Sequence, residues 1–405
     1  MKYLVLSMMI MSSVYALPIK TGEHFRTAIP GEFIVKTAGE KIAQNVKRVL
    51  GKNLYLLKDT TQKSLAKYKY AYPNYQYFGD YKDVESNRPN DINFEKQFHH
   101  QMVKTTVAWN TTSGDEKIIV AVTDNEFQID HKDLESSWWK NQDEIANNGI
   151  DDDGNGYIDD VVGWDFFNND NNVVDPTQST HGTHVSGIIA ATANNKSGGV
   201  GVAPGVKVMP LKWYGEDGSW TSAIISETYH YAVDNGAKII TTSYNVDGFV
   251  DDQAYLAAIK YIRSHDVIIF NSAGNAGQKN PPRQKIKELV LVCSVKSGNE
   301  KKQDKKSSFS NYGTGIDICA PGDPVYAPIK WSTGTQDHYG ELSGTSMAAP
   351  VAAAVAALIW SAHPNFTDEE VIQKLYDSAD NIDKRNFWYK KKLGAGRVNA
   401  AKAVL

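Results

Sequence analysis

The sequence has 405 residues, of which 41% are hydrophobic and 22% are charged, as in an ordinary globular protein. Its formal net charge is −4, from 43 basic and 47 acidic side chains. This balance argues against a nucleic-acid partner, or an anionic membrane, that is bound mainly by electrostatics. The length leaves room for about two or three domains.

The amino-terminal residues 1–16 have the three parts of a secretory signal peptide. Lys2 supplies the positive start, residues 4–11 form the apolar centre, and residues 14–16 are a small-residue cleavage site. The apolar run is shorter than the roughly 20 residues that a membrane span needs. We therefore expect an exported protein, periplasmic or extracellular, without a membrane anchor.

Residues 17–85 are expected to form a small α+β unit. A strand is predicted at 30–36, a helix from the spacing of apolar residues at 42–49, and a Tyr- and Lys-rich β segment at 67–77. The polar segment 80–91 that follows has the composition of an exposed connection suited to cleavage. The unit is either a pro-segment or a permanent domain.

The large unit, residues 86–405, alternates apolar strands with helices. Strands are predicted at 117–124, 206–212, 238–243, 266–271 and 289–295, and helices at 222–235 and 252–264. This alternation predicts a three-layer αβα fold with a mostly parallel central sheet. Reactive groups in such sheets gather at the carboxyl ends of the strands, where Asp124 and Asn275 fall.

A serine and a histidine each stand at the start of a predicted helix. Ser346 lies in the segment 344–350 (GTSMAAP), which continues into an alanine-rich helix whose amino-terminal N–H groups would face the Ser346 hydroxyl. A serine nucleophile needs a base and an orienting acid. The segment 181–187 (HGTHVSG) offers His181, or His184 as an alternative base, and Asp124 offers the acid. Asn275 could donate its amide N–H to an oxyanion.

The two cysteines, Cys293 and Cys319, each lie in a β-like apolar run. Export permits a disulfide between them, but we favour two buried thiols in neighbouring strands.

An acidic insertion at about 141–178 contains a possible calcium loop. Carboxylates and amides alternate with glycine turns, as in oxygen-rich calcium sites. The bidentate glutamate of an EF-hand is missing, because Val162 stands at loop position twelve. The alternative is a solvated acidic loop. The candidate Ca²⁺ ligands are Asp151, Asp153, Asn155, the carbonyl of Tyr157, Asp159 and Asp160.

Taken together, these motifs resemble those of the subtilisin-like serine proteases, the subtilase family. The segments 122–124 (VTD), 181–187, 273–275 (AGN) and 344–350 match the four family motifs in the order Asp, His, Ser that subtilisin has. The segments 201–204, 308–313 and 396–400 resemble further family segments, so the resemblance covers about 90–405. Residues 30–36 and 72–77 resemble the ends of the family's inhibitory propeptide.

The resemblance implies a serine endopeptidase made as a zymogen, with protein or peptide substrates and its own propeptide as an intramolecular inhibitor. Asp124, His181 and Ser346 would form the triad, and Asn275 with the Ser346 N–H would bind the oxyanion. We expect a monomer with a structural Ca²⁺ ion. The residues implied to line the substrate cleft are Ser243, Tyr244, Asn245, Ser272, Ala273 and Gly274.

Two positions depart from the family pattern. Asp124 is followed by Asn125 and Glu126 where Ser or Thr and then Gly are usual, and Tyr244–Asn245 replace the usual Leu-Gly. Neither change removes a reacting group. They nevertheless leave open an alternative function, a catalytically inactive protein that kept the protease fold and binds peptides.

Overall fold

The computed structural model describes most of the large unit and the strands of a smaller one. The described residues are 19–21, 24–36, 46–51, 54–58, 70–78, 88–174, 180–215, 219–298, 303–330 and 337–405. Contacts divide the chain into the units Met1–Val84 and Glu85–Leu405. The expected signal peptide at 1–16 and much of the polar segment 80–91 lie outside the described residues.

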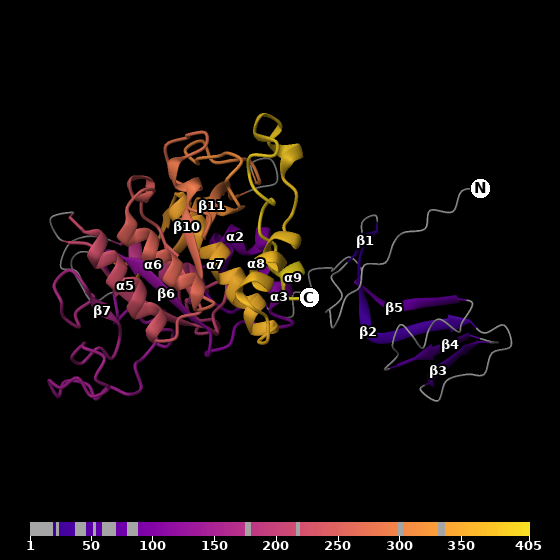
Figure 1. Cartoon of the computed structure of the whole chain (residues 1–405), viewed down its shortest axis with the longest axis horizontal. Coiled ribbons are helices and arrows are strands. Elements are labelled where there is room, and N and C mark those ends of the chain that lie inside the picture. Colours follow the sequence, from indigo (N-terminus) through magenta and orange to yellow (C-terminus); the bar gives the residue numbers. More distant parts are fainter. Residues whose placement is uncertain are drawn as a thin grey trace. The chain divides into compact units, whose positions relative to one another are not determined.

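The described part of the amino-terminal unit is a five-stranded antiparallel sheet (Figure 1). The order is β1-β2-β4-β3, and β5 pairs with the other side of β2. The strands predicted at 30–36 and 67–77 correspond to β2 and β5. The strands are β1 (Ile19–Thr21), β2 (His24–Lys36), β3 (Val46–Gly51), β4 (Leu54–Leu57) and β5 (Tyr70–Phe78).

The helix expected at 42–49 is wrong over its second half, because residues from Val46 onward form β3. This strand pairs with β4, and Val46 packs against the buried pair Val35 and Leu57. A window of eight residues with β-branched side chains fits either structure, and pairing with a neighbouring strand decides between them. Residues 42–45 lie outside the described residues.

The large unit is built on a seven-stranded sheet of order β12-β11-β10-β9-β6-β8-β7, and every neighbouring pair is parallel. The parallel sheet and all five predicted strands are confirmed. The strands are β6 (Ile119–Asp124), β7 (Trp164–Asp165), β8 (Lys207–Lys212), β9 (Ile239–Thr242), β10 (Ile268–Ser272), β11 (Leu289–Lys296) and β12 (Ile318–Asp323).

Helices cover both faces of this sheet and bury two separate cores. Alternate residues of each strand enter opposite cores: Val120 and Val122 belong to the core that contains α4 and α7, whereas Ala121 belongs to the core that contains α5 and α6. This is the expected three-layer αβα arrangement (Figure 1). The principal helices are α4 (His181–Ala190), α5 (Ser222–Asp234), α6 (Gln253–Ser264), α7 (Thr345–Ala362) and α8 (Asp368–Asp377).

Shorter elements complete the described part of this unit. They are the helices α2 (Phe98–Val103), α3 (Thr105–Ala108) and α9 (Ala400–Ala403), the hairpin strands β13 (Val325–Ile329) and β14 (His338–Leu342), and the 3-10 turns η2 (Phe94–Lys96), η3 (Asp247–Phe249), η4 (Pro282–Lys285), η5 (Asp383–Arg385) and η6 (Phe387–Tyr389).

Helix α7 is the central helix of the unit. Its alanine-rich sequence lets it pack closely on the sheet, and every residue from Thr345 to Trp360 is buried. Among the described residues it is the one helix long and apolar enough to cross a membrane, but 89% of that window is buried inside the protein. Its composition is therefore accounted for by its place in the core.

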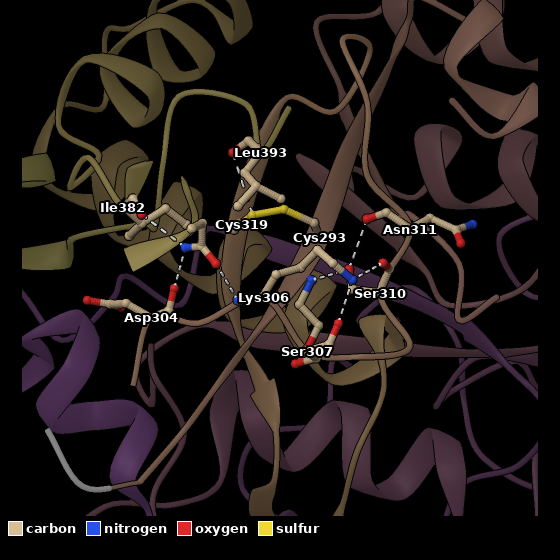
Figure 2. Close-up of a disulfide and its surroundings, with 11 residues drawn as sticks. Cys293, Asp304, Lys306, Ser307, Ser310, Asn311, Cys319, Ile382 and Leu393 are labelled. Carbon is tan, nitrogen blue, oxygen red and sulfur yellow. Dashed lines mark hydrogen bonds between the residues drawn. A yellow bond between two sulfur atoms is a disulfide. The ribbon is translucent and has the colours of Figure 1, made fainter. Parts of the chain in front are cut away.

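The two cysteines form a disulfide, so the expectation of free buried thiols is wrong (Figure 2). Cys293 in β11 and Cys319 in β12 are direct partners in the parallel register. Their Cα atoms lie 4.4 Å apart, within the range that a disulfide spans. The sequence places both residues in strands, but their register depends on how those strands pair.

Candidate active site

An acid and an imidazole meet at the carboxyl edge of the sheet. Asp124 is the last residue of β6, the strand between β8 and β9, and His181 is the first residue of α4. His181 Nδ1 lies 2.8 Å from each carboxylate oxygen of Asp124. The backbone N–H of Asn125 also donates to Asp124, at 2.9 Å. The carboxylate of Asp124 is thereby fixed with its oxygens directed at the imidazole.

The environment of His181 favours its charged form. Burial alone lowers the pKa of an imidazole, but the negative charge of Asp124 and its hydrogen bond outweigh burial and raise the pKa of His181 above its ordinary value. The side chain keeps 31% of its surface exposed. Nδ1 is occupied by Asp124, so Nε2 is the ring nitrogen that can exchange a proton with another group.

His184, the alternative base, has a structural position. It is fully buried, and its Nε2 lies 3.1 Å from the Val325 carbonyl and 3.3 Å from the Gly340 carbonyl of the β13–β14 hairpin. Burial lowers the pKa of His184 to about 3. The ring therefore stays neutral and holds the hairpin against α4.

Ser346 is the second residue of α7 and is 8% exposed. Its hydroxyl donates to the carbonyl of Ser243 at 3.1 Å, and the Ser243 hydroxyl donates to the Ser346 carbonyl at 3.1 Å. That carbonyl is available because Pro350, four residues later, has no N–H to donate within the helix. Ser243, expected in the cleft wall, thus lies against Ser346.

The hydrogen bonds of the described residues include none between His181 and Ser346. Hydrogen bonds between a nucleophile and its base are often long in a free enzyme and tighten when substrate binds. The two residues come from the amino-terminal ends of α4 and α7, helices that pack on the same face of the sheet.

Asn275 and the start of α7 flank one small space. The carboxamide oxygen of Asn275 accepts from the backbone N–H of Thr345 at 2.9 Å and from its hydroxyl at 2.8 Å. Because both bonds use the carboxamide oxygen, the Nδ2 group of Asn275 remains available as a donor. A β-carbon built on Gly344 would lie 3.6 Å from Asn275 Nδ2 and 3.5 Å from the Ser346 nitrogen. Two N–H donors therefore border the volume beside Gly344.

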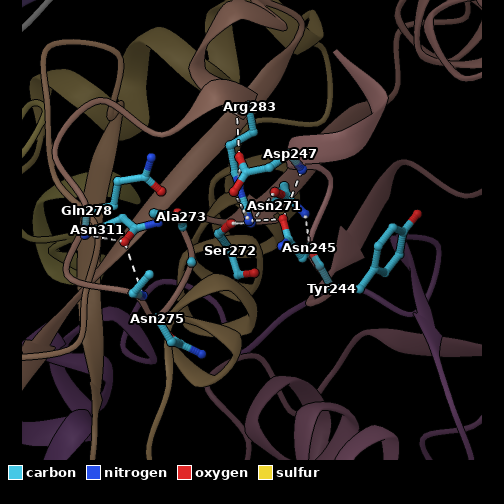
Figure 3. A network of polar contacts seen from close by, with 12 residues as sticks. Tyr244, Asn245, Asp247, Asn271, Ser272, Ala273, Asn275, Gln278, Arg283 and Asn311 are labelled. Atoms are coloured by element: carbon cyan, nitrogen blue, oxygen red, sulfur yellow. Dashed lines mark hydrogen bonds and ion pairs between the residues drawn. The ribbon is translucent and has the colours of Figure 1, made fainter. Parts of the chain in front are cut away.

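Asn311 holds the loop that carries Asn275 (Figure 3). Its Nδ2 donates to the Ala273 carbonyl at 2.8 Å, and its Oδ1 accepts from the backbone N–H groups of Ala276 and Gln278 at 3.2 and 2.7 Å. Asn311 is 1% exposed. The sequence alone assigns Asn311 no role. The only signal was its position in the segment 308–313, which resembles a family segment.

Lys306 supports the turn that precedes Asn311 (Figure 2). Its ammonium group donates to the carbonyls of Ser307, Ser308 and Ser310 at 2.8, 3.3 and 2.7 Å. The ring of Tyr389 lies 4.8 Å from Nζ. Burial lowers the pKa of Lys306 to about 8, so the side chain is still mainly protonated at neutral pH.

The two segments expected to line the cleft follow the carboxyl ends of β9 and β10, and a buried arginine joins them (Figure 3). Arg283 is 2% exposed. Its guanidinium donates to the side chain of Asn245 and, at 2.6 Å, to the carbonyl of Ser272. Asp247 accepts two more of its bonds at 3.0 Å each. The side-chain oxygen of Asn245 is thus engaged by Arg283.

Tyr244 belongs to an aromatic group beside the same segment. Its ring centroid lies 4.3 Å from that of Trp213, and its hydroxyl hydrogen-bonds the hydroxyl of Tyr229. Burial is the main reason why the pKa of Tyr244 is raised well above its ordinary value. Ala273 and Gly274 continue from β10, and the Gly274 N–H donates to the Thr345 hydroxyl at 3.1 Å.

Glu126 is fully buried two residues after Asp124. The hydroxyl of Thr183 donates to its carboxyl group at 3.2 Å, and the Lys330 ammonium lies 3.8 Å away. Burial, the largest cause, raises the pKa of Glu126 to about 8, and the charge of Asp124 adds to the increase. The side chain that replaces the usual glycine therefore turns inward, beside α4.

Part of the acidic insertion converges on one point. Carboxylate oxygens of Glu144, Asp153 and Asp160 all lie within 4.8 Å of one another. The Asn141 amide donates to Asp153 and Asp160 at 2.9 Å each. Three carboxylates so close together repel one another unless a cation or protons neutralise them. Glu144 lies outside the spacing that identified the loop, and its acidic character was the only sequence signal.

The other candidate ligands contact different groups. Asn155 donates to Asp153 and Asp160 at 3.0 Å each. Asp151 accepts from the backbone N–H groups of Asn155 and Gly156, and Asp159 accepts from those of residues 148 and 149. The Tyr157 hydroxyl donates to Glu227. The structure thus brings Asp153, Asn155 and Asp160 together, while the carboxylates of Asp151 and Asp159 bond to the loop backbone.

Comparisons with known proteins agree with this geometry. Residues 115–399 match the model of the subtilase family, Peptidase_S8. The chain is 32% identical to thermitase of Thermoactinomyces vulgaris over 317 residues, which cover 78% of this chain and 99% of thermitase. It is 31% identical to a thermophilic serine proteinase of Bacillus sp. strain AK1, covering 83% and 72% of the two chains.

A solved structure of proteases from Pseudoalteromonas arctica PAMC 21717 superposes with a TM-score of 0.62 at 29% identity, covering 78% of this chain and 98% of the other. A lanthipeptide protease superposes with a TM-score of 0.58 at 25% identity, covering 77% and 95%. The expected fold and resemblance are therefore confirmed. The chain belongs to the subtilase family and is a subtilisin-like serine endopeptidase.

Proposed function

We propose that this serine protease is exported as a zymogen and cleaves peptide bonds with the triad Asp124, His181 and Ser346. The observation that carries the proposal is the contact of His181 Nδ1 with both oxygens of Asp124 at 2.8 Å. It fixes the imidazole at the carboxyl edge of the sheet and leaves Nε2 to act as the base.

The proposed reaction proceeds through an acyl-enzyme. Ser346 Oγ leaves its bond with the Ser243 carbonyl and attacks the peptide carbonyl carbon, while its proton passes to His181 Nε2. Asn275 Nδ2 and the Ser346 N–H bind the oxyanion. The C–N bond then breaks as His181 gives its proton to the leaving amine. Water, deprotonated by His181, hydrolyses the ester and restores Ser346.

The substrate is proposed to bind as an extended strand between 243–245 and 272–274. Both segments continue from the parallel strands β9 and β10, beyond Thr242 and Asn271, the last residues that these two strands pair with each other. Extended peptides add to such edges through backbone hydrogen bonds. Arg283 keeps the two segments together by bonding Asn245 and the Ser272 carbonyl, so the cleft walls are held before substrate arrives.

The amino-terminal unit is proposed to be a propeptide that inhibits the enzyme until it is removed. Its contacts form a unit of their own, separate from residues 85–405, and its small sheet is consistent with a module that is released intact. The signal pattern at 1–16 supports export. A relative, the Nep protease of Natrialba magadii, is described as extracellular. We also propose that the mature enzyme is a monomer.

A structural Ca²⁺ ion is proposed for the acidic insertion. Glu144, Asp153 and Asp160 supply hard oxygen ligands at suitable mutual distances, and the Asn155 side chain bonds to two of them. The ion would offset two of the three negative charges and stabilise the long insertion between β6 and α4.

A fluorophosphonate probe tests the proposal, because it labels only an activated serine. We expect the mature protein to be labelled at Ser346 and to hydrolyse peptides. Ser346→Ala should lose labelling, hydrolysis and propeptide removal, whereas Ser361→Ala in the same helix should keep all three. A folded chain that is not labelled would instead support the alternative of an inactive peptide-binding protein.

A further inference from the structure

The turn formed by residues 381–392 exposes two large aromatic side chains next to each other. Phe387 is 75% exposed and Trp388 is 82% exposed, more than any other large hydrophobic residue in the described part of the chain. Their rings pack edge to face with centroids 5.5 Å apart. Exposing an apolar area of this size to water is unfavourable. The two adjacent exposed side chains therefore indicate that a partner surface covers them.

The turn is anchored at its base. The Asn386 side chain is buried and donates to the carbonyls of Asp304 and Ile382 at 2.7 and 2.9 Å, and it accepts from the Lys306 N–H at 2.7 Å. The ring of Tyr389 packs against Tyr312 with centroids 4.8 Å apart. Phe387 and Trp388 are therefore presented on an ordered support, which reduces the entropy lost on binding.

Positive charge surrounds the aromatic pair. The turn carries five cationic side chains against one carboxylate, Asp383, although the chain as a whole has a net charge of −4. The balance of the whole chain, which argued against electrostatic binding to an anionic membrane, therefore does not describe this local surface. The ion pairs of the described residues include none of the five cations. These cations are Lys384, Arg385, Lys390 and Lys391, which are exposed, and Lys392, which is half-buried.

A polar pocket opens at the foot of the turn. Its volume is about 430 Å³, and its lining includes Asn381, Asp383, Lys391 and residues 394–396. The pocket is lined in part by the turn that exposes the aromatic rings, and its cation suits the phosphate of a lipid headgroup, with Asp383 as the one carboxylate in the lining.

We propose that residues 381–392 dock the protein on an anionic phospholipid surface. Phe387 and Trp388 enter the boundary between headgroups and acyl chains, where aromatic side chains are preferred. The five cations contact lipid phosphates. Neither part alone gives stable attachment, because a small apolar insertion or a few charges bind weakly and reversibly. The turn combines both, independently of catalysis.

Sedimentation with lipid vesicles tests the proposal. The full chain carries Ser346→Ala to prevent autolysis and is mixed with vesicles of phosphatidylcholine, with or without one-third phosphatidylglycerol. We expect binding to the anionic vesicles that falls steeply as salt rises. Phe387→Ser with Trp388→Ser should lower the partition coefficient at least about tenfold. Changing Lys390, Lys391 and Lys392 to Gln should lower it on the order of 100-fold, since each lysine contributes about fivefold.

Matched controls separate the turn from general charge and hydrophobicity. Lys117, Lys140 and Lys260 are exposed lysines elsewhere, and changing all three to Gln makes the same change in net charge. Ile92→Ser removes another exposed apolar side chain, 73% exposed. Both controls should bind vesicles as the parent does. Peptide hydrolysis by the turn variants, measured with Ser346 intact, should be unchanged and shows that they fold.

Three results would overturn the proposal. The first is equal or no binding to the two vesicle types, and the second is unchanged binding by the turn variants. The third is binding to soluble heparin, lost in the lysine variant, without binding to vesicles. That result would identify a polyanionic polymer as the ligand of this turn.

Discussion

Glu126 places a second carboxyl group beside the Asp124–His181 pair, and its protonation couples folding to pH. Because burial raises the pKa of Glu126 to about 8 in the folded protein, the folded state holds a proton that the unfolded state has lost above about pH 4.5. The folded state therefore binds more protons between these two values, and stability falls as pH rises through that interval. Above about pH 8 both states are ionised, and this contribution no longer changes.

Glu126→Gln should remove this fall in stability. The neutral amide keeps the shape of the side chain and does not ionise, so the variant should be more stable relative to the parent at pH 8.5 than at pH 5. Urea unfolding at the two pH values measures the difference, in the Ser346→Ala background. The exposed Glu116→Gln is the control. Parallel pH dependence in parent and Glu126→Gln would show that the buried carboxyl does not titrate in this range.

The same substitution tests whether Glu126 acts on the imidazole. His181 must be neutral to act as a base, so kcat/KM rises as pH rises through the pKa of His181. An ionised Glu126 adds to the charge that raises the pKa of His181, but Glu126 is ionised only above about pH 8. Glu126→Gln should therefore leave the part of the acid limb below about pH 8 in place. A limb that moves to lower pH in the variant would show that Glu126 is already charged there, in spite of its burial.

Thr345 orients the side chain proposed to bind the oxyanion. Its hydroxyl donates to Asn275 at 2.8 Å and its backbone N–H at 2.9 Å. Thr345→Val keeps only the backbone bond, so it should loosen the amide and lower kcat with little change in KM. Removing an oxyanion donor outright costs about 10²–10³ in kcat, and we expect a smaller loss, about tenfold, for the misoriented donor. Thr228→Val in α5, another buried threonine, should leave kcat unchanged. Equal kcat values in the two variants would contradict the orienting role.

At the scale of the elements, the disulfide joins the neighbouring strands β11 and β12. The chain between these strands carries Asn311, which holds the Asn275 loop. β11 and β12 are already paired, and the bridge closes a loop with a sequence separation of 26 residues. Changing Cys293 and Cys319 together to Ala should lower the free energy of unfolding by about 2–4 kcal/mol. Urea unfolding measures this loss. Both cysteines are fully buried, so a reductant added to the native protein should have no such effect until the protein unfolds.

Local patterns in the sequence predicted the elements that bury apolar residues and carry reacting groups. The five apolar strands and the helix after Ser346 were predicted correctly because their burial leaves a mark in consecutive residues. The helix expected at 42–49 was wrong because its structure depends on pairing with β4. The Cys293–Cys319 bridge was not favoured for the same reason, since the sequence does not show which residues of β11 and β12 are opposite each other.

The site follows the same division. Asp124, His181, Ser346 and Asn275 lie in short recognisable segments. Their supports come from distant parts of the chain, and no local pattern gives them a supporting role: Asn311 lies 36 residues beyond Asn275, and Ser243 contacts Ser346 only because β9 ends beside α7. Glu144 joins Asp153 and Asp160 through the folding of the insertion. The supports of a site are set by tertiary structure, whereas its reacting groups are set by local chemistry.

At the scale of the whole molecule, removal of calcium should lower stability. A ligand that binds only the folded state stabilises it, by about 2.7 kcal/mol at a concentration 100 times its dissociation constant. A chelator should therefore lower the melting temperature of the mature protein, and added Ca²⁺ should restore it.

Glu144→Gln with Asp160→Asn should abolish the response to chelator, because the double variant lacks two of the three converging carboxylates. Asp143→Asn, an exposed acid next to the cluster, should respond as the parent does. If chelator left the melting temperature of all three proteins unchanged, the proposal of a metal ion in the insertion would be wrong.

The ammonium of Lys306, bonded to three carbonyl oxygens, affects how the enzyme responds to ionic strength. A sodium or potassium ion bound by the same carbonyl oxygens would dissociate at low salt concentration and would be exchanged for other cations at high salt concentration. Here the cation is tethered to the backbone by its own aliphatic stem. The turn before Asn311, and through it the Asn275 loop, should accordingly be held equally well at low and at high ionic strength.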